Sequence, residues 1–415
     1  MRIIPKTAKV KAEFFKNVTI LDVIIAFVGL FLTVMLFLTN LGYVRFILMT
    51  ICLCIVVLLF IPIDGQRFYL FFVNFVKYLF SIKHYSTEYS NSSTNINNII
   101  PFKGVDGKYI VYKDYFGEVL EIDPREFRLI SGFKQDQIID VYFGRIIRSI
   151  SGNTKASIVK IDRKLSFKEF MDGEEAKRQE LLRLYQEQSI TEGELSVRQR
   201  IIDDRIKVYQ TLQDKNNIEK PFYYLVVYDE QKSVLDEIMD NAINSFLEAG
   251  MTSRVVEGKD LGIFLKYTYT DNFNEEDVDY LRDEEFMNWI IPHDIKFSPK
   301  SINIDGQETY NFTIRNYPIS VMNAWGYQMF NIQGTKVVMN IEPYEKQKAI
   351  KMLDRSLQEL ASQSEQSFKV SSVIDKQTHI NTLVNVMRML QNDNETLFKV
   401  NLHFTVYNKE QKNNV

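Results

Sequence analysis

Two long apolar runs, separated by only a few turn residues, place the strongest constraint on how this chain folds. The first run extends from Ile20 to Leu38 and the second from Val44 to Ile61, and each contains one charged residue. At 1.5 Å per residue, about 19 helical residues span about 28 Å, close to the ~30 Å hydrocarbon core of a bilayer. We therefore predict a transmembrane helical hairpin whose two spans are bounded by these four residues.

Two other readings of the runs are weaker. The runs could be two helices packed in a soluble domain, but such helices normally keep a polar stripe that faces solvent. Nearly every face of both runs is apolar, so no such stripe is present. A cleaved signal peptide would need a small-residue cleavage site after the first run, but a second apolar run follows at once.

Basic residues flank the hairpin on one side. Five precede the first run and three follow the second: Arg2, Lys6, Lys9, Lys11 and Lys16, then Arg67, Lys77 and Lys83. By the positive-inside tendency, we expect both termini and the large following domain on the cytoplasmic side. Asp22 and Arg45 lie near span ends, where snorkelling toward the interface explains them; a buried functional pair is the alternative.

The segment Phe68 to Phe80 is apolar but too short to cross a bilayer. Its aromatic residues and Lys77 are typical of a helix that lies in the headgroup region, with a core helix of the soluble part as the alternative. Cys52 and Cys54 are two positions apart in the second run, so they point to different helix faces and do not form a metal clamp. We expect them to be packing or lipid-facing residues.

The composition of the full chain is that of an ordinary folded protein. Over all 415 residues, hydrophobic residues make up 46% and charged residues 25%, and the net charge is −3 with a pI near 6.0. These values exclude disordered and disulfide-stapled chains and do not support a protein built to neutralise nucleic-acid phosphates. The polar, aperiodic stretch Ser86 to Asn98 predicts a linker between the membrane part and an acidic body.

Helix and strand patterns alternate after this linker, which predicts an α+β fold. We expect four regions: a hairpin with its interfacial helix over 1–85, a linker over 86–99, a first α+β lobe over 100–215 and a second over 216–415. The first lobe contains a long charged stretch, Ser166 to Asp214, that predicts helices projecting from the body. The clearest other elements are helices at 134–150, 231–249, 345–360 and 370–391, and strands at 157–161, 222–228, 289–297, 336–341 and 397–407.

No motif for catalysis, cofactor binding or metal binding is evident, and we predict no such site residues. Gly107-Lys108 and Gly258-Lys259 lack the glycine loop and following hydroxyl of a phosphate-binding loop. The four histidines are scattered: His84, His293, His379 and His403. The acidic segment Asp271 to Glu285 does not have the spacing of a Ca²⁺ loop and predicts a solvated surface. Basic and acidic residues alternate throughout, so no nucleic-acid face is indicated.

An ordered series of motifs nevertheless resembles a known family. Val105 to Asp162 contains a strand pair, a DPxEF-type turn, a helix with Gln-Asp-x-Ile-Ile and a strand of the I-x-K-x-D-R kind. Further matches are Pro221 to Val227, Asp305-Gly306 and Arg315 to Pro318. This order, across most of residues 100–407, resembles the N-terminal domain of the conjugative-transfer ATPases of type IV secretion systems (TraE/TraC/CagE/TrbE type). The apolar hairpin looks like the small two-span subunit of these systems.

The resemblance implies a membrane-anchored scaffold at the bacterial inner membrane. In the family, a motor domain with a phosphate-binding loop follows, and ATP and Mg²⁺ are expected only for that domain. The implied partners are the membrane, other secretion subunits, and either copies of itself or a motor subunit. The alternative is a split or truncated secretion ATPase whose hydrolysis needs that missing motor. An unrelated membrane-tethered sensor or adaptor is a third reading.

Overall fold

The computed structural model divides the chain into two compact units. The structure describes residues 2–3, 13–15, 18–38, 42–63, 66–87, 94–125, 130–164, 167–214, 219–314, 317, 320–321, 325–365, 370–392 and 395–408. Unit 1 comprises residues 1–95, 316–323 and 344–397; unit 2 comprises residues 96–315, 324–343 and 398–415. Together they contain helices and a large antiparallel sheet, which confirms the predicted α+β class.

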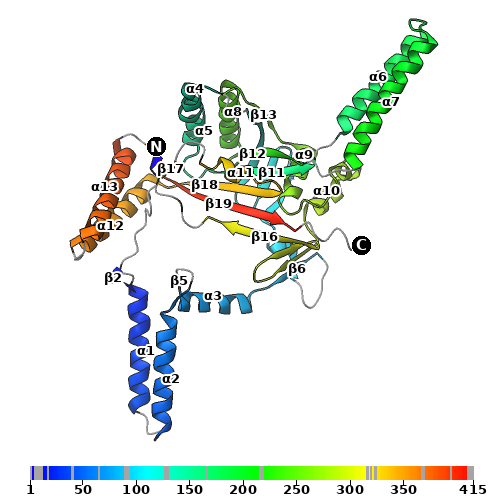
Figure 1. The fold of residues 1–415 in the computed structure, drawn as a ribbon. Helices are drawn as coiled ribbons and strands as arrows, with labels where there is room; N and C mark the ends of the chain where they lie inside the picture. The colour runs from blue at the N-terminus through cyan, green and yellow to red at the C-terminus, as the bar shows by residue number, and fades with distance from the viewer. Residues whose placement is uncertain are drawn as a thin grey trace. The chain divides into compact units, whose positions relative to one another are not determined.

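Unit 1 contains the apolar hairpin, formed by α1 (Ile20–Leu38) and α2 (Val44–Leu59). The short strands β4 (Pro62–Ile63) and β5 (Gln66–Arg67) lead into α3 (Phe68–Phe80), which turns away from the axis of α2 (Figure 1). The remaining elements of the unit are β1 (Arg2–Ile3), β2 (Glu13–Phe15), β3 (Val18–Thr19), β6 (His84–Ser86), β7 (Thr94–Asn95), β17 (Ser320–Val321), α12 (Lys346–Glu365) and α13 (Val370–Asn392).

Helices α12 and α13 form a second helical pair in unit 1. Apolar residues at helical spacing, among them Leu353, Leu360 and Leu383, are buried between them. The pair matches the helices predicted at 345–360 and 370–391, with each helix a little longer than the periodicity indicated.

Unit 2 is built on one antiparallel sheet. Its strands lie in the order β14-β15-β16-β19-β18-β11-β12-β10-β9-β8, with β13 also paired to β10. In chain order they are β8 (Phe102–Asp106), β9 (Tyr109–Tyr112), β10 (Phe116–Asp123), β11 (Lys155–Lys164), β12 (Glu219–Asp229), β13 (Thr252–Val255), β14 (Asp294–Phe297), β15 (Ile302–Ile304), β16 (Gln307–Thr313), β18 (Thr335–Pro343) and β19 (Phe398–Tyr407).

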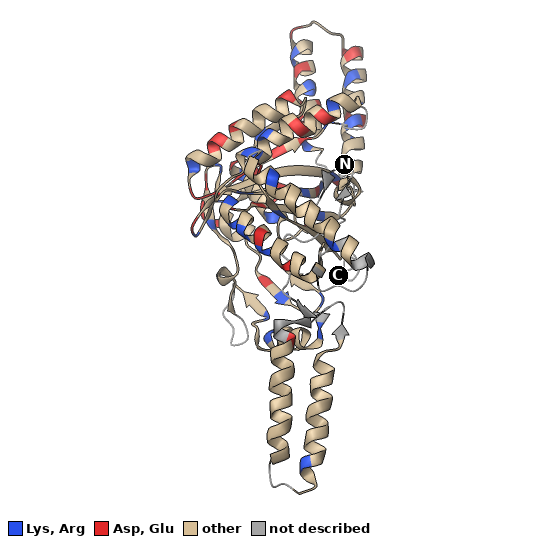
Figure 2. Cartoon of the chain, turned by 90° about the vertical axis from the view of Figure 1, so that its left-hand side faces the viewer, with Lys and Arg blue, Asp and Glu red and all other residues tan. Residues whose placement is uncertain are grey.

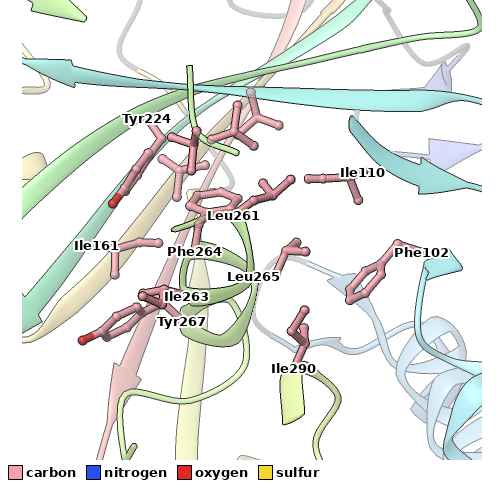
Figure 3. Close-up of a cluster of buried hydrophobic side chains, with 14 of the residues drawn as sticks. Phe102, Ile110, Ile161, Tyr224, Leu261, Ile263, Phe264, Leu265, Tyr267 and Ile290 are labelled. Carbon is pink, nitrogen blue, oxygen red and sulfur yellow. The ribbon is translucent and has the colours of Figure 1, made fainter. Parts of the chain in front are cut away.

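Both faces of this sheet are covered near its centre, which explains why β12 reads as a continuous apolar run. On one face, Leu225 and Val227 pack with residues of α5 (Gly144–Ser149) and α8 (Lys232–Glu248). On the other face, Tyr224 and Val226 pack against α9 (Gly258–Tyr267) and α10 (Asp283–Ile290) (Figure 3). Successive residues of one strand thus serve two separate cores.

Shorter helical elements complete unit 2. They are η1 (Ile96–Asn98), α4 (Gly132–Gln137), the π-helical segment η3 (Ile138–Phe143), η4 (Glu275–Tyr280) and α11 (Tyr327–Phe330). The segment α4-η3-α5 corresponds to the helix predicted at 134–150, with a π-helical middle that the amphipathic pattern did not reveal.

The projecting helices are α6 (Lys168–Gln186) and α7 (Glu192–Asp214), an antiparallel pair that extends from the sheet of unit 2 (Figure 1). The helices predicted within Ser166 to Asp214 are therefore present over Lys168–Gln186 and Glu192–Asp214, while Ser166 lies outside the described residues. Leu181, Leu195 and Ile202 form the small buried core between them.

The structure differs from the sequence predictions in the division into two lobes. The predicted boundary between residues 215 and 216 falls between β11 and β12, yet these strands are paired over ten positions, from Lys155–Tyr228 to Lys164–Glu219. The two predicted lobes therefore share one sheet. The long inserted helices separate the two strands in sequence, which is why they read as parts of different lobes.

Two smaller predictions also need correction. The predicted linker over 86–99 includes β7 and η1, and Ile96 is buried, so its end belongs to the folded unit 2; residues 88–93 lie outside the described ranges. The strand predicted from Trp289 begins at Asp294 instead, because Trp289 belongs to α10, which starts at the acidic residues Asp283 to Glu285. At the start of α10, the Glu285 carboxylate accepts a hydrogen bond from the backbone N–H of Arg282.

Buried ionic groups connect the sheet to its loops. Lys160, 1% exposed, donates from Nζ to Asp162 Oδ2 at 2.6 Å and to the carbonyls of Ile332 and Thr335. Arg163 donates to both carboxylate oxygens of Glu275, which lies in the acidic segment predicted to be solvated. That segment is therefore partly a structural element, because one of its carboxylates is engaged by the sheet.

The close contact at Gly262 yields a prediction about α9. A Cβ at this position would lie 2.6 Å from Cε2 of Phe286 in α10, so Gly262→Ala forces the ring to shift. Overpacking of this kind costs about 1–3 kcal/mol. We expect a lower urea midpoint for the full chain, measured by tryptophan fluorescence.

The matched control is Gly173→Ala in α6, where no atom lies within 4 Å of the added Cβ. This substitution should stabilise the chain slightly, since alanine is favoured over glycine in helices by about 1 kcal/mol. Equal effects of the two substitutions would contradict the contact at Gly262.

The buried amine of Lys336 yields a second prediction. Burial lowers its pKa from 10.5 to about 8, and its Nζ donates to the carbonyl of Thr268. Below about pH 8 the folded state carries the full cost of the buried charge. As pH rises from 8 to 10.5 the folded state releases its proton first, so stability rises. We expect Lys336→Met to be more stable than wild type by about 1–2 kcal/mol at pH 7, after the lost hydrogen bond is subtracted.

This advantage should shrink as the pH approaches 10.5. Urea unfolding at a series of pH values measures it, with Lys300→Met, at an exposed site, as the control. A constant difference across this range would show that the amine does not titrate as described.

Candidate functional site: the apolar helical hairpin

The surface of α1 and α2 is apolar and exposed around most of each helix. Figure 2 shows the two helices almost free of charged residues. Large side chains that remain exposed include Ile24, Phe27, Leu30, Phe31, Val34, Leu38, Phe46, Ile47, Ile51, Leu53, Ile55 and Val57. A monomer in water does not normally expose a contiguous apolar surface of this extent, so it marks an interaction site.

The two helices approach each other closely at Gly29. A Cβ added there would overlap the side chain of Val56, so only glycine permits this contact. One turn further along α1, Thr33 Oγ1 donates to the Gly29 carbonyl at 2.8 Å and lies 3.5 Å from Cys52 Sγ. Small residues and hydroxyl groups at a helix–helix contact are typical of packing in lipid, where close backbone approach is the main attraction.

A cluster around Asp22 joins the base of the hairpin to α3. Asp22 is only 2% exposed and lies in the first turn of α1, where the helix dipole favours a negative charge. Its Oδ1 accepts a hydrogen bond from the hydroxyl of Tyr69 at 3.1 Å and lies 3.6 Å from Nε of Arg67. Arg67 also donates from Nη1 to the carbonyl of Phe60 at the C-terminus of α2.

Arg45 lies at the other end of the hairpin. Its guanidinium is 4.8 Å from the ring centroid of Phe46 and 5.5 Å from that of Phe37. Asp22 and Arg45 therefore do not form the functional pair that the sequence left open. Arg45 instead shows the arrangement of a charge near a helix end that is surrounded by aromatic rings.

Helix α3 carries an apolar surface of its own. Phe71, Phe72, Phe75 and Phe80 are exposed on it, and Lys77 lies in its last turn. Shortly after its end, Lys83 Nζ lies 4.5 Å from the ring of Tyr78. No residue of α3 is buried, so the core-helix alternative for this segment is not supported by the described contacts.

The bounds of the helices bear on the predicted span residues. Helix α1 begins at Ile20 and ends at Leu38, and α2 begins at Val44 but ends at Leu59, two residues before Ile61. Among the helices of the described residues, none combines the length and the apolar character needed to cross a membrane. The two spans stay a prediction.

A separate cavity lies in unit 2, at the ends of β11, β12 and β18. It has a volume of about 580 Å³, and its lining includes Lys155, Ser157, Tyr228, Asp229, Asn340 and Glu342. Ser157 donates to Asn340 at 2.7 Å, and Asp229 accepts from Thr154 and from the backbone of Gln231. Its polar groups are thus engaged in the fold itself, which makes this cavity a weaker candidate than the hairpin.

The two lysines that follow glycines in the sequence, Lys108 and Lys259, form ion pairs within the fold. Lys108 lies 2.9 Å from Glu118 and 2.7 Å from Asp236, and Lys259 pairs with Asp279. Within the described ranges, no group of three His, Cys, Asp or Glu side chains is placed to hold a metal ion.

Sequence reasoning missed the partners of Asp22. In the sequence, Arg67 stands out only as a positive charge after the second apolar run, and Tyr69 only as one aromatic residue of the segment Phe68 to Phe80. A usable signal was available, since an acidic residue in the first turn of an apolar helix requires a nearby partner. The basic residues Lys6, Lys9, Lys11 and Lys16 lie outside the described residues.

No protein-family model matches this chain, and no curated protein matches it.

The cluster at the base of the hairpin yields a third prediction. Asp22→Ala removes the acceptor shared by Tyr69 and Arg67 and should loosen the junction between α1 and α3 by about 1–2 kcal/mol, since Arg67 is partly exposed. We expect faster hydrogen–deuterium exchange over residues 66–72 in detergent. Asp22→Asn retains an acceptor for Tyr69, so its exchange rate over these residues should lie between those of wild type and Asp22→Ala.

The control is Glu284→Ala, which removes an exposed carboxylate from unit 2. Unchanged exchange over residues 66–72 in Asp22→Ala would show that the cluster does not hold α3 in place.

Proposed function

We propose that this protein is a membrane-anchored assembly component of a type IV secretion machine for conjugative DNA transfer, corresponding to the N-terminal part of its transport ATPase. The observation that carries the anchoring role is the exposed apolar surface of α1 and α2. The ordered motifs from Val105 to Asp162 and from Pro221 onward support the secretion role. The motif Arg315 to Pro318 lies largely outside the described residues.

In this proposal the hairpin crosses the bacterial inner membrane, and both termini and the α+β body are cytoplasmic. Helices of 19 and 16 residues measure about 28 Å and 24 Å, somewhat less than the ~30 Å core. A bilayer accommodates a short apolar element by thinning or by snorkelling of flanking residues. Asp22, Arg67 and Tyr69 then lie at the cytoplasmic boundary, and α3 lies in the headgroup region with Lys77 toward the lipid phosphates.

The acidic, charge-patterned body suits a scaffold role beneath the membrane. Its projecting pair α6–α7 and its broad sheet supply surfaces for other secretion subunits, for a motor subunit or for a second copy. Direct nucleic-acid binding is not part of the proposal, because basic and acidic residues alternate over the body.

Membrane anchoring is tested by substituting arginine at exposed sites in the middle of both helices. Phe31→Arg with Leu53→Arg places two charges in the hydrocarbon core, at about 2.5–3.5 kcal/mol each on insertion scales. We expect wild type to resist alkaline carbonate extraction from bacterial membranes and the double variant to be released. Phe133→Arg, at an exposed apolar site of α4, is the control and should behave as wild type.

Release of the wild-type chain by carbonate would refute the anchor. The secretion role is tested separately, in a conjugative element that encodes this chain. Deletion of the gene should abolish DNA transfer, and wild type but not the double arginine variant should restore it. Transfer at normal frequency without the gene, or failure of the full chain to copurify with any secretion subunit, would refute the assembly role.

The alternative function is a split secretion ATPase that hydrolyses ATP once a second chain supplies the phosphate-loop motor. It predicts that the purified chain raises ATP hydrolysis by such a motor subunit, with the rate measured by phosphate release. An unchanged rate, with copurification retained, would favour the scaffold.

A further inference from the structure

The projecting pair α6–α7 has more apolar surface than its own packing uses. Its internal core consists of Leu181, Leu195 and Ile202. Four further apolar residues of α7 remain exposed, at 59% for Val197 and 56% for Val208, with Ile201 and Leu212 between 37% and 47%.

These four residues form one continuous stripe. At about 100° per residue, positions 197, 201, 208 and 212 fall within about 60° of one another around the helix. The core residues Leu195 and Ile202 face about 120° away from the centre of this stripe by the same count. Helix α7 therefore has two apolar faces, and only one of them is covered by α6, which is the pattern of a helix in a bundle of more than two.

A groove runs between α6 and α7 beside this stripe. It has a volume of about 340 Å³, with Leu181, Ile201 and Ile202 on its floor. One rim, from α6, carries Glu174, Lys177 and Glu180, and the other, from α7, carries Arg198 and Arg205. The groove is thus apolar in its centre. Glu174 is buried and already paired with Lys177 and Arg205, so Glu180 on one rim and Arg198 on the other remain as the opposite charges that face outward.

Ion pairs between α6 and α7 show which residues of the two helices lie at the same height along the helix axes. Arg205 Nη1 lies 3.4 Å from Glu174 Oε1, and Arg178 pairs with Asp203. The two helices are antiparallel, so a step forward along α6 and a step back along α7 move in the same direction. Six residues forward from Glu174 and seven back from Arg205 rise about 9 Å and about 10.5 Å, which is nearly the same height. Glu180 and Arg198 therefore stand at the same height on opposite rims.

We propose that this face of α6–α7 binds the same face of a second copy. The two α6–α7 pairs then form a four-helix bundle about a two-fold axis parallel to the helices. This arrangement places α6 of each copy over α7 of the other, and the apolar stripe and groove floor are buried between them. Glu180 of one copy then faces Arg198 of the second copy at the same height, and the symmetry repeats the pair. A self-complementary surface of this kind is what a two-fold interface requires.

The charge pattern is the reason to assign a second copy rather than an unrelated helix. Glu180 and Arg198 at one height make the face complementary to itself, with Glu180 shared between Arg183 of its own helix and Arg198 of the second copy. The inference deepens the proposed function, because it names the surface through which the assembly component associates with itself.

The contact area predicts a weak dimer in free solution. Two helices about 28 Å long and 20 Å across together cover roughly 550 Å² per copy, near the lower end of specific interfaces. Anchoring in a common membrane raises the effective concentration of the two faces. Dimerisation should therefore be stronger in a bilayer than in dilute detergent.

The test uses the full chain in detergent and in lipid nanodiscs, with Cys52→Ser and Cys54→Ser to remove the native thiols. Glu180→Cys and Arg198→Cys are made in separate chains and mixed with a short bismaleimide. The mixed dimer keeps one intact Glu180–Arg198 pair while it brings the two cysteines together. We expect a cross-linked dimer from the mixture and little from either chain alone.

Two sets of variants sharpen the result. Ile201→Glu with Val208→Glu should lower the yield of cross-linked dimer at least tenfold, since it places unpaired charge in the interface. Leu182→Glu, at an exposed apolar site on the other side of α6, should leave it unchanged. In the thiol-free chain, Glu180→Arg or Arg198→Glu alone should weaken the dimer seen by mass photometry, and the two together should restore it.

The proposal is overturned by equal cross-linking in the mixture and the separate chains, by a loss in Leu182→Glu equal to that in Ile201→Glu with Val208→Glu, or by failure of the charge exchange to restore association. A heterologous helix bound at this face, with no dimer, also overturns it. These outcomes are independent of carbonate extraction and DNA transfer, so failure of the dimer is distinct from failure of the proposed function.

Discussion

The pairing of β11 with β12 is the interaction on which the rest of the body depends. Ten consecutive antiparallel positions join these strands, and each has a further neighbour, β18 on one side and β10 on the other. Alternate residues of β12 supply the two cores, so a shift of one position would exchange the side chains meant for α8 and α9. The burial of both faces is what fixes the register.

The sequence predicted the elements far better than their assembly. A continuous apolar run located α1, and apolar periodicity located α12, α13 and β19, to within a few residues, because both patterns are local in the sequence. It could not show that β11 and β12 are partners across 54 intervening residues, since pairing leaves no local signal. The same limit hid the contacts between Arg163 and Glu275 and between Asp22 and Arg67, which join groups distant in sequence.

The exposed apolar surfaces of α1–α2 and of α6–α7 differ in kind. The hairpin α1–α2 is apolar on nearly all sides and has small residues at its internal contact, as expected for a lipid solvent. The pair α6–α7 has a narrow apolar stripe bordered by charges, as expected for a protein partner in water. The distribution of charge, more than the amount of apolar surface, distinguishes these two surfaces.

The position of β19 has a consequence for biosynthesis. This strand lies between β16 and β18, although residues 398–407 are translated after both of them. At about 5–20 residues per second, the hairpin leaves the ribosome many seconds before the sheet is complete. Until then β16 and β18 present open edges, which are vulnerable to pairing with other chains. Under the proposed anchoring, the first two helices hold the nascent chain at the membrane until β19 is made, which separates these open edges from most other unfinished chains.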